Sequence, residues 1–183
     1  MVYIHLAEGF EEIEALACVD LLRRVGLETL MVSVTGRKAV KSVRGVTVEA
    51  DILFEEADYN KCEMIVLPGG MPGAKNLEEH QALINTIIEF AEKGEWIAAI
   101  CASPMILGHK GLLKGRKATI FPGMEEDLEG ADAMPERVVI DGNIITSQGP
   151  GTAMEFAIAI VSVLKGKVIA ENLKKDLVMF DEQ

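Results

Sequence analysis

Residues Trp96–Pro104 have the sequence WIAAICASP, in which an uninterrupted apolar run ends at a cysteine, two small residues and a proline. An apolar run without polar alternation is typical of a parallel strand that is buried on both faces of its sheet. Pro104 suits the first turn of a helix, where the missing N–H of proline is not needed. The segment therefore predicts a buried strand, Trp96–Ile100, that turns tightly at Cys101 and enters a short helix, Ala102–His109.

The rest of the chain repeats this alternation of short apolar runs and longer amphipathic stretches. The runs predict strands at Met1–Leu6, Glu28–Val34, Val46–Glu49 and Glu63–Leu67, and the stretches predict helices at Phe10–Val25, Gln81–Lys93, Gly151–Leu164 and from Val168 to Leu173 or beyond. In the first helix, apolar residues recur at helical spacing at Ile13, Leu16, Ala17, Leu21 and Val25. Asp141-Gly142, between apolar runs at Arg137–Ile140 and Asn143–Ser147, predicts a β-hairpin.

Strands that alternate with helices favour βαβ units and a parallel sheet covered on both faces. We therefore expect a flavodoxin-like α/β/α sandwich of three layers with a mostly parallel sheet, in one domain spanning residues 1–183. Ligands of such sheets bind beyond the carboxyl ends of the strands. Three predicted loops lie there: Ala7–Glu14, Pro68–Gly73 and Cys101–Pro104.

The composition excludes several classes of function. The formal net charge is −11, with 29 acidic against 18 basic residues, so neither nucleic acid nor an anionic membrane is expected as the main partner. No apolar run reaches 18 residues, and the first residues do not resemble a signal peptide. Three cysteines without zinc-type spacing predict reduced thiols, a cytoplasmic location and no metal.

Cys101 is the strongest candidate for chemistry. A cysteine at the end of an apolar strand, followed by small residues and a helix, has the layout of a nucleophile elbow. A thiol beside the N–H groups of a helix N-terminus is expected to have a lowered pKa, and the thiolate is the reactive species. The simpler interpretation is a small buried core residue, and it suits Cys18 and Cys62 better.

Two neighbouring segments complete the expected site. Val66–Gly70, VLPGG, ends the preceding strand, and the N–H of Gly70 together with that of Ala102 could form an oxyanion hole. Acidic residues crowd the first strand-to-helix junction at Glu8, Glu11, Glu12 and Glu14. Glu14 is the candidate for a desolvated carboxyl of raised pKa that exchanges a proton with the thiol. The pattern alone does not separate Glu14 from Glu11 or Glu12.

The histidines do not offer a base for the thiol. His5 falls inside the first strand, His80 precedes a surface helix, and His109 ends the short helix after Cys101. A cysteine assisted by a carboxyl therefore fits better than a Cys-His pair.

Four segments in the same order resemble the DJ-one branch of the ThiJ/PfpI superfamily. They are AEGFEEIEA (Ala7–Ala15), VLPGG (Val66–Gly70), AAICASP (Ala98–Pro104) and TSQGPGTAMEFA (Thr146–Ala157), and the similarity runs from residue 2 to about residue 178. The resemblance implies a flavodoxin-like fold, similar to that of class I glutamine amidotransferases, a homodimer and a site without a cofactor.

The resemblance also implies residue roles. It places the nucleophile at Cys101, the protonated carboxyl at Glu14 and the oxyanion donors at Gly70 and Ala102. It places Gly69, Phe121, Gly149 and Pro150 around the pocket, and Arg44 near the dimer interface and the site.

Three departures from related branches narrow the activity. Phe121 stands where some members carry a histidine, which disfavours a Cys-His mechanism. Ala102 replaces the histidine that follows the cysteine in the protease-like branch, so peptidase activity is not expected. The His-x-Glu motif that glutamine amidotransferases need downstream is absent from the sequence.

Three functions remain open. The first is a cofactor-free glyoxalase or deglycase that acts on small carbonyl substrates, namely methylglyoxal-type α-oxoaldehydes or their early glycation adducts. The second is an oxidative-stress sensor or chaperone that uses oxidation of Cys101. The third is a binding or structural module, which would have an ordinary thiol at Cys101.

Overall fold

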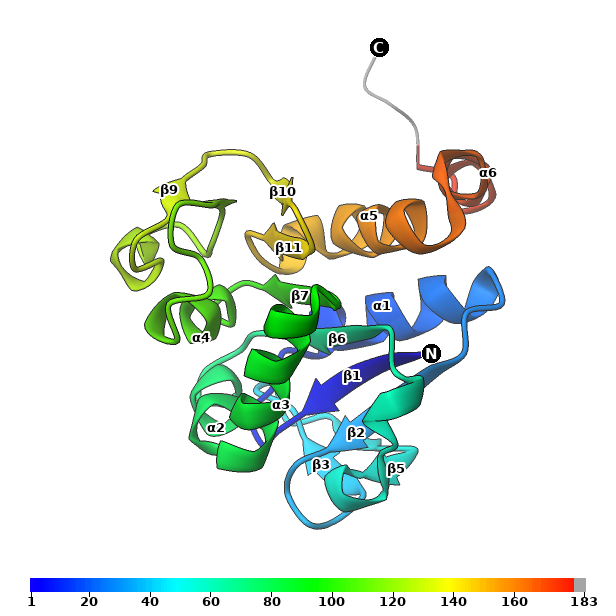
Figure 1. The fold of residues 1–183 in the computed structure, drawn as a ribbon. Helices are drawn as coiled ribbons and strands as arrows, with labels where there is room; N and C mark the ends of the chain where they lie inside the picture. Colours follow the sequence, from blue (N-terminus) through cyan, green and yellow to red (C-terminus); the bar gives the residue numbers. More distant parts are fainter. Residues whose placement is uncertain (180–183) are drawn as a thin grey trace.

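The computed structural model describes residues 1–179, and its centre is a seven-stranded sheet in the order β10-β11-β7-β6-β1-β2-β5 (Figure 1). Every neighbouring pair is parallel except β10 and β11. Its strands are β1 (Val2–Leu6), β2 (Thr29–Ser33), β5 (Ile52–Leu53), β6 (Met64–Leu67), β7 (Trp96–Ile100), β10 (Val138–Asp141) and β11 (Ile144–Ser147). Two small sheets pair β3 (Ala39–Lys41) with β4 (Thr47–Glu49), and β8 (Lys117–Ala118) with β9 (Asp132–Ala133).

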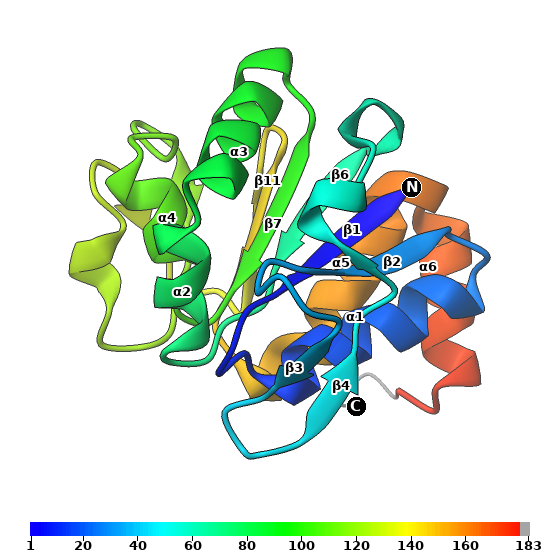
Figure 2. The same cartoon turned by 90° about the horizontal axis from the view of Figure 1, so that it is seen from below.

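Helices cover both faces of the main sheet (Figure 2). The helices are α1 (Glu12–Arg24), α2 (Gly73–Glu79), α3 (Gln81–Lys93), α4 (Pro104–His109), α5 (Ala153–Lys165) and α6 (Lys167–Asp176). Four 3₁₀ turns lie at η1 (Phe54–Glu56), η2 (Tyr59–Lys61), η3 (Glu125–Asp127) and η4 (Pro150–Thr152). Helices α1, α5 and α6 lie on one face, and α2, α3 and α4 lie on the other. The predicted three-layer α/β/α architecture is therefore confirmed.

The buried strands explain the two cores of the protein. Along β1, Val2, Ile4 and Leu6 pack into the core beneath α1 and α5, whereas Tyr3 belongs to the core beneath α2 and α3. Successive side chains of a strand point to opposite faces, so a strand between two helical layers is buried at every position and is mostly apolar. His5 is the one polar residue of β1, and its Nε2 lies 2.7 Å from the Tyr59 hydroxyl. The uninterrupted apolar runs in the sequence have this cause.

Several expected elements differ in detail. Val46–Glu49 contributes to β4 in a separate hairpin with β3, not to the main sheet. The helix after Cys101 begins at Pro104, so Ala102 lies in the turn. The sequence did not predict α2, the two-residue strand β5, or the small sheet of β8 and β9. The hairpin at Asp141-Gly142 is confirmed, with Asp141 opposite Ile144.

The predicted apolar face of the first helix was wrong at Ile13 and Leu16, whereas Leu21 is buried as expected. Ile13 is 55% exposed and Leu16 is 36% exposed. The buried face of α1 is made of Glu14, Ala15, Cys18, Val19, Leu21 and Leu22. The pattern was misleading because this helix buries a carboxyl and leaves apolar residues in solvent.

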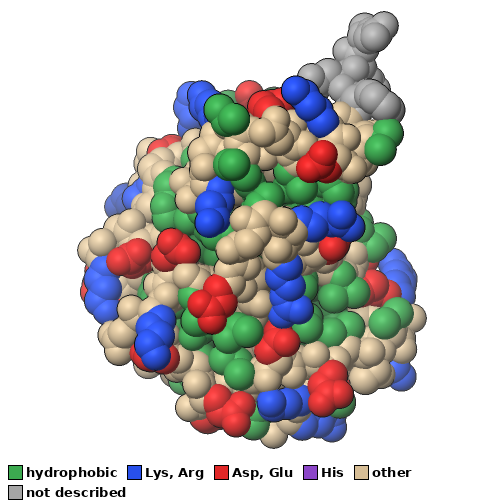
Figure 3. Space-filling view, turned by 90° about the vertical axis from the view of Figure 1, so that its right-hand side faces the viewer, with side chains coloured by type: hydrophobic (Ala, Val, Ile, Leu, Met, Phe, Trp, Pro, Cys, Tyr) green, Lys and Arg blue, Asp and Glu red, His purple; other side chains and the backbone are tan. Residues whose placement is uncertain are grey.

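Within residues 1–179, no helix is long and apolar enough to cross a membrane. On the face that Figure 3 shows, Lys and Arg side chains are interspersed with Asp and Glu side chains and do not gather into one basic patch. The last four residues of the single domain expected over 1–183 lie outside the described part of the chain.

Candidate active site

Three loops meet at one edge of the sheet because β1, β6 and β7 are parallel neighbours. The loop after β1 leads into α1, the loop after β6 contains Gly69 and Gly70, and the turn after β7 contains Cys101. Two bonds fasten the loops together. The Glu11 N–H donates to the Gly69 carbonyl over 2.9 Å, and the Ser103 hydroxyl donates to the Pro68 carbonyl over 2.6 Å.

Cys101 has an unusual backbone conformation. Its φ is +63°, and among residues 1–179 Val178 is the only other non-glycine residue with a positive φ. Left-handed backbone is costly for a residue with a side chain, so an outlier of this kind suggests a functional position. Two bonds hold the turn: the Cys101 N–H donates to the Ser147 carbonyl, and the Phe121 N–H donates to the Cys101 carbonyl, both over 2.9 Å.

The glycines around Cys101 are needed for space. An added Cβ at Gly69 would lie 2.5 Å from Cys101 Cβ and 2.9 Å from Glu14 Oε2. Gly70 has a φ of +86°, and a Cβ there would lie 2.6 Å from the nitrogen of Glu11. Gly149 packs close to Phe121 and to the sulfur. A Cβ added at Gly149 would lie 3.3 Å from the Phe121 ring and 4.0 Å from Cys101 Sγ.

Glu14 is the carboxyl that the structure brings to the thiol. Its side chain is fully buried, and Oε2 accepts a 2.7 Å hydrogen bond from the Gly69 N–H. Glu11 has a different task, because its Oε2 accepts the Glu14 N–H over 2.9 Å and caps α1. The contacts therefore separate Glu14, which lies beside the thiol, from Glu11, a choice that the sequence pattern left open.

Burial decides the protonation of Glu14. Loss of solvent raises its pKa to about 7, against the hydrogen bonds from Gly69 and Cys101, which lower it. The contact with the thiol lowers the pKa of Glu14 and raises that of Cys101. Glu14 Oε1 has no other hydrogen-bond partner among the described residues. Near neutral pH, this carboxyl can both accept and donate a proton.

The expected lowering of the thiol pKa was wrong. Burial, together with the negative charge of Glu14, raises the pKa of Cys101 to about 12. Backbone N–H groups of Gly70 and Ala102 act in the opposite direction. Helix α4 has only six residues and begins at Pro104, so its dipole is weak. The thiol therefore depends on a neighbouring group to take its proton.

A pocket of about 260 Å³ opens beside the sulfur. It is lined by Gly70, Met71, Cys101, Ala102, Phe121 and Met124. The sequence did not predict that Met71 and Met124 line the pocket. Met71 follows the glycine turn and Met124 lies in an irregular loop, and neither position carries a periodic signal. Pro150 begins η4 after Gly149 and is not part of the pocket lining.

Arg44 does not line the pocket. It lies exposed in the loop between β3 and β4, and its charge lowers the pKa of Glu11 against the larger effect of burial. The hairpin is fastened to the site loop by two 2.8 Å bonds, from the Gly9 N–H to the Lys41 carbonyl and from the Val43 N–H to the Phe10 carbonyl.

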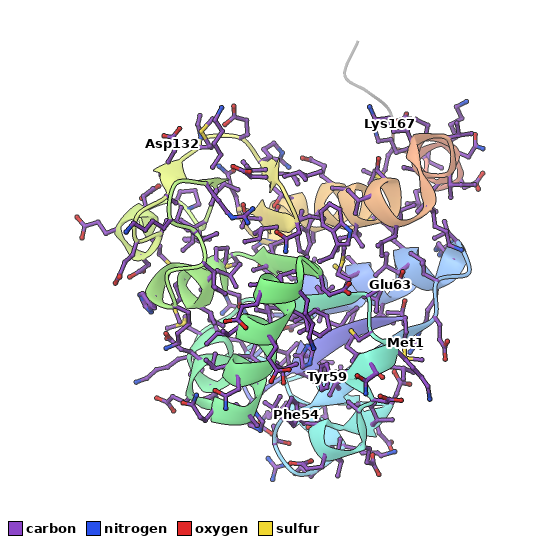
Figure 4. All side chains as sticks on the ribbon, viewed as in Figure 1. Met1, Phe54, Tyr59, Glu63, Asp132 and Lys167 are labelled. Carbon is purple, nitrogen blue, oxygen red and sulfur yellow. The ribbon has the colours of Figure 1, made fainter. Side chains whose placement is uncertain are left out.

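The histidines have partners away from the thiol. His5 is buried, and its Nε2 lies 2.7 Å from the Tyr59 hydroxyl, which stands next to Phe54 (Figure 4). His80 Nδ1 accepts the Leu83 N–H at the start of α3. His109 Nδ1 lies 2.8 Å from Glu78 Oε1. Within residues 1–179, no group of three or more His, Cys, Asp or Glu residues is arranged to hold a metal ion.

A family model described as the DJ-1/PfpI family matches residues 1–163. The chain belongs to this family. It is 40% identical to Protein DJ-1 homolog B of Arabidopsis thaliana over 95% of its own length, but spans only 40% of that relative. It is 33% identical to the Glutathione-independent glyoxalase DJR-1.2 of Caenorhabditis elegans, covering 93% of this chain and 91% of the relative.

Solved structures of the DJ-1/PfpI family confirm the fold. The structure described as oxidized Toxoplasma gondii DJ-1 superposes with a TM-score of 0.93 at 37% identity, covering 97% of each chain. The resemblance inferred from the four sequence segments is thus confirmed, and with it the mostly parallel sheet between two helical layers.

Proposed function

We propose that this DJ-1/PfpI protein is a cofactor-free glyoxalase or deglycase in which Cys101 is the nucleophile and Glu14 moves the protons. The observation that carries the proposal is the buried carboxyl of Glu14, with a pKa of about 7, beside the Cys101 thiol. A general acid-base group works best when its pKa is near the working pH. The name of the Caenorhabditis elegans relative supports the same reaction class.

The first step joins the sulfur to the aldehyde carbon of an α-oxoaldehyde. As the S–C bond forms, Glu14 takes the thiol proton and the carbonyl electron pair moves onto oxygen. The N–H groups of Gly70 and Ala102, which already interact with the sulfur, hydrogen-bond the new oxyanion. Protonation of that oxygen by Glu14 gives a hemithioacetal.

The second step moves a proton between two carbons. The Glu14 carboxylate removes the hydrogen of the former aldehyde carbon, giving an enediolate, and returns it to the neighbouring carbon. The proton of the first hydroxyl moves to the oxygen of that neighbouring carbon, which becomes the new hydroxyl. The product is a thioester of a 2-hydroxy acid. Water adds to the thioester, the C–S bond breaks, and the sulfur leaves as the thiol. The aldehyde and one water become one hydroxy acid, so the reaction needs no oxidant.

A deglycase would share these later steps. It would start from an early adduct of the aldehyde with an amine of a protein or nucleotide, and the amine would leave when Cys101 forms its bond to carbon. The two reactions therefore use one set of residues.

The test is lactate formation from methylglyoxal without glutathione. We expect turnover by the wild type and a loss of at least about 100-fold in Cys101→Ser and Glu14→Gln, as is typical for groups in acid-base and nucleophilic roles. Cys62→Ser is the control, because Cys62 is buried and donates only to the Met64 carbonyl. Equal rates in the wild type and Cys101→Ser would overturn the proposal.

A second candidate, a peroxide sensor, is supported by the difference between the three cysteines. Cys101 is half-buried and lines the pocket, whereas Cys18 and Cys62 are buried. Desolvation raises the pKa of all three thiols, so the difference between them lies in exposure. Peroxide would oxidise the Cys101 thiolate to a sulfenate and be reduced to water. Intact-mass spectrometry after mild peroxide tests this function. Equal oxidation of Cys62 and Cys101 would exclude it.

We also propose a homodimer. Ile13 and Leu16 are exposed on one side of α1, and Val46 is 48% exposed in the loop between β3 and β4. Contiguous exposed apolar surface is typical of protein interfaces, and Ile13 and Leu16 lie within one turn of the same helix. Sedimentation of the wild type and of Ile13→Glu tests the proposal, with Val168→Glu on α6 as the matched control. The account requires that only Ile13→Glu dissociates, and a wild type that sediments as a monomer would contradict it.

A further inference from the structure

The pocket beside Cys101 has walls of a single chemical kind. Its larger side chains are Met71, Phe121 and Met124, and the remaining lining residues are Gly70, Ala102 and Cys101 itself. Among residues 1–179, no Lys, Arg, His, Asp or Glu lines it. At about 260 Å³ the pocket is smaller than the ~300–1,000 Å³ of sites for drug-sized ligands. It nevertheless has several times the ~30 Å³ that one water molecule takes in the liquid.

The apolar wall is partly uncovered. Met71 is 50% exposed and Phe121 is 45% exposed, although both are large apolar side chains at the mouth of the site. An apolar group placed against them would remove this surface from water, which is favourable. Thioethers adapt to the shape of a neighbour and contact aromatic rings favourably, so two methionines and a phenylalanine suit an aryl or branched alkyl group.

The backbone fixes Phe121 relative to the sulfur. The Phe121 N–H donates to the Cys101 carbonyl over 2.9 Å, and the Met124 N–H donates to the Phe121 carbonyl over 3.0 Å. Gly149 packs against the Phe121 ring, and a Cβ added at Gly149 would lie 3.3 Å from Phe121 Cδ2. The backbone at Phe121 is therefore held next to Cys101.

The charges around the site disfavour an anionic substrate. The Glu14 carboxyl interacts with the sulfur, and within residues 1–179 of the protomer no cation lines the pocket to offset its charge. Two basic residues act on this acidic junction, and both lie outside the pocket: Arg44 lowers the pKa of Glu11, and Arg37 pairs with Glu8 over 2.6 Å. A carboxylate or phosphate on the substrate would lose water without gaining a partner, which is costly.

We propose that Met71, Phe121 and Met124 select uncharged α-oxoaldehydes whose acyl substituent is apolar and larger than methyl, and that they exclude substrates with an anionic substituent. The inference rests on the proposed function, since it assigns the substrate class of the same site. Phe121 and Met71 are specificity residues in this account and take no part in proton transfer.

The test compares three aldehydes: methylglyoxal, phenylglyoxal and 4-carboxyphenylglyoxal. For the wild type we expect kcat/KM to be about 10-fold or more higher for phenylglyoxal than for methylglyoxal, and lower again for the carboxylated ring by a similar factor. In Phe121→Ala, the ratio of phenylglyoxal to methylglyoxal should fall toward one. Val168→Ala, a change on exposed α6, should keep the wild-type ratio.

The outcomes separate this inference from the proposed function. Turnover of methylglyoxal with equal kcat/KM for all three aldehydes would overturn the substrate class and leave the reaction standing. If no aldehyde is turned over, the proposed function fails, and alkylation of Cys101 then tests the pocket. N-benzyl-iodoacetamide should react faster than iodoacetamide, and iodoacetate more slowly. Equal rates for the three reagents would overturn the proposal that the apolar wall selects apolar groups and disfavours anionic ones.

Discussion

The Gly69 N–H donates a 2.7 Å hydrogen bond to Glu14 Oε2, and the same glycine leaves no room for a Cβ beside Cys101. One residue of the loop after β6 thus orients the carboxyl and makes space for the thiol. Gly69 and Cys101 lie in the loops after β6 and β7, and Glu14 lies in the first turn of α1, which follows the loop after β1. The parallel strands bring these three segments to one edge of the sheet.

Gly69→Ala is expected to disrupt this arrangement. The new methyl would lie 2.5 Å from Cys101 Cβ and 2.8 Å from the Ile100 carbonyl oxygen, so the turn at Cys101 must shift. We expect a loss of about 1–3 kcal/mol in the free energy of unfolding, typical of overpacking, and a larger proportional loss of turnover. Gly151→Ala is the control, because nothing lies within 4 Å of its added Cβ. Equal effects of the two changes would contradict the close contact.

Glu14 should make stability depend on pH. Its folded-state pKa is about 7 against an ordinary 4.5, so the folded protein holds this proton more tightly than the unfolded chain. The contribution is complete below pH 4.5 and is lost as the pH rises through about 7. The shift corresponds to about 3 kcal/mol. Urea unfolding at pH 5 and pH 8 should show that the wild type loses stability relative to Glu14→Gln at the higher pH. A constant difference between the two proteins would refute the raised pKa.

His109 should hold its proton more tightly than a free histidine. The hydrogen bond to Glu78 raises its pKa, with a smaller contribution from Asp127, whose Oδ1 lies 3.5 Å from Nε2. This stabilisation is complete below the ordinary pKa of 6.5 and is lost as the pH rises through the folded value. NMR titration should show a lower His109 pKa in Glu78→Gln.

Glu79 provides the control for this titration. It belongs to the same helix and pairs with Lys75 at the surface, so Glu79→Gln should leave the His109 pKa unchanged. An equal shift of the His109 pKa in both variants would mean that the contact with Glu78 does not set this pKa.

Ser103 should stabilise the elbow. Its buried hydroxyl donates to the Pro68 carbonyl over 2.6 Å and links the two loops that carry the site. In Ser103→Ala the carbonyl keeps no such partner, and a buried polar group left unsatisfied costs about 1–3 kcal/mol. Urea unfolding measures the loss, and Ser162→Ala on α5 provides the comparison. A loss no greater than that of Ser162→Ala would show that the carbonyl is satisfied in another way.

Much of the fold follows from the sequence because burial on both faces leaves a clear pattern. The runs at Glu63–Leu67 and Trp96–Ile100 predicted β6 and β7 almost to the residue, and the cysteine after β7 predicted the elbow. Two-residue strands such as β5 carry no periodicity, which is why they were missed.

The site was harder to predict than the fold. Helix α1 buries Glu14 and exposes Ile13, which reverses the usual rule on which the helical face was assigned. The pKa of Cys101 depends on the burial of the sulfur and on the charge of Glu14, which are three-dimensional quantities. The methionines of the pocket lie in irregular segments, where sequence gives no spacing to follow.

The coupling of Cys101 to Glu14 is tested most directly by the rate of alkylation of Cys101 with iodoacetamide as a function of pH, followed by mass spectrometry. In the wild type, the rate should rise with an inflection near pH 7, where the Glu14 carboxyl becomes able to accept the thiol proton. In Glu14→Gln the inflection should move well above 7, because burial alone keeps the thiol protonated. The same inflection in both proteins, or a wild-type value at the ordinary thiol pKa of about 8.5, would contradict the account.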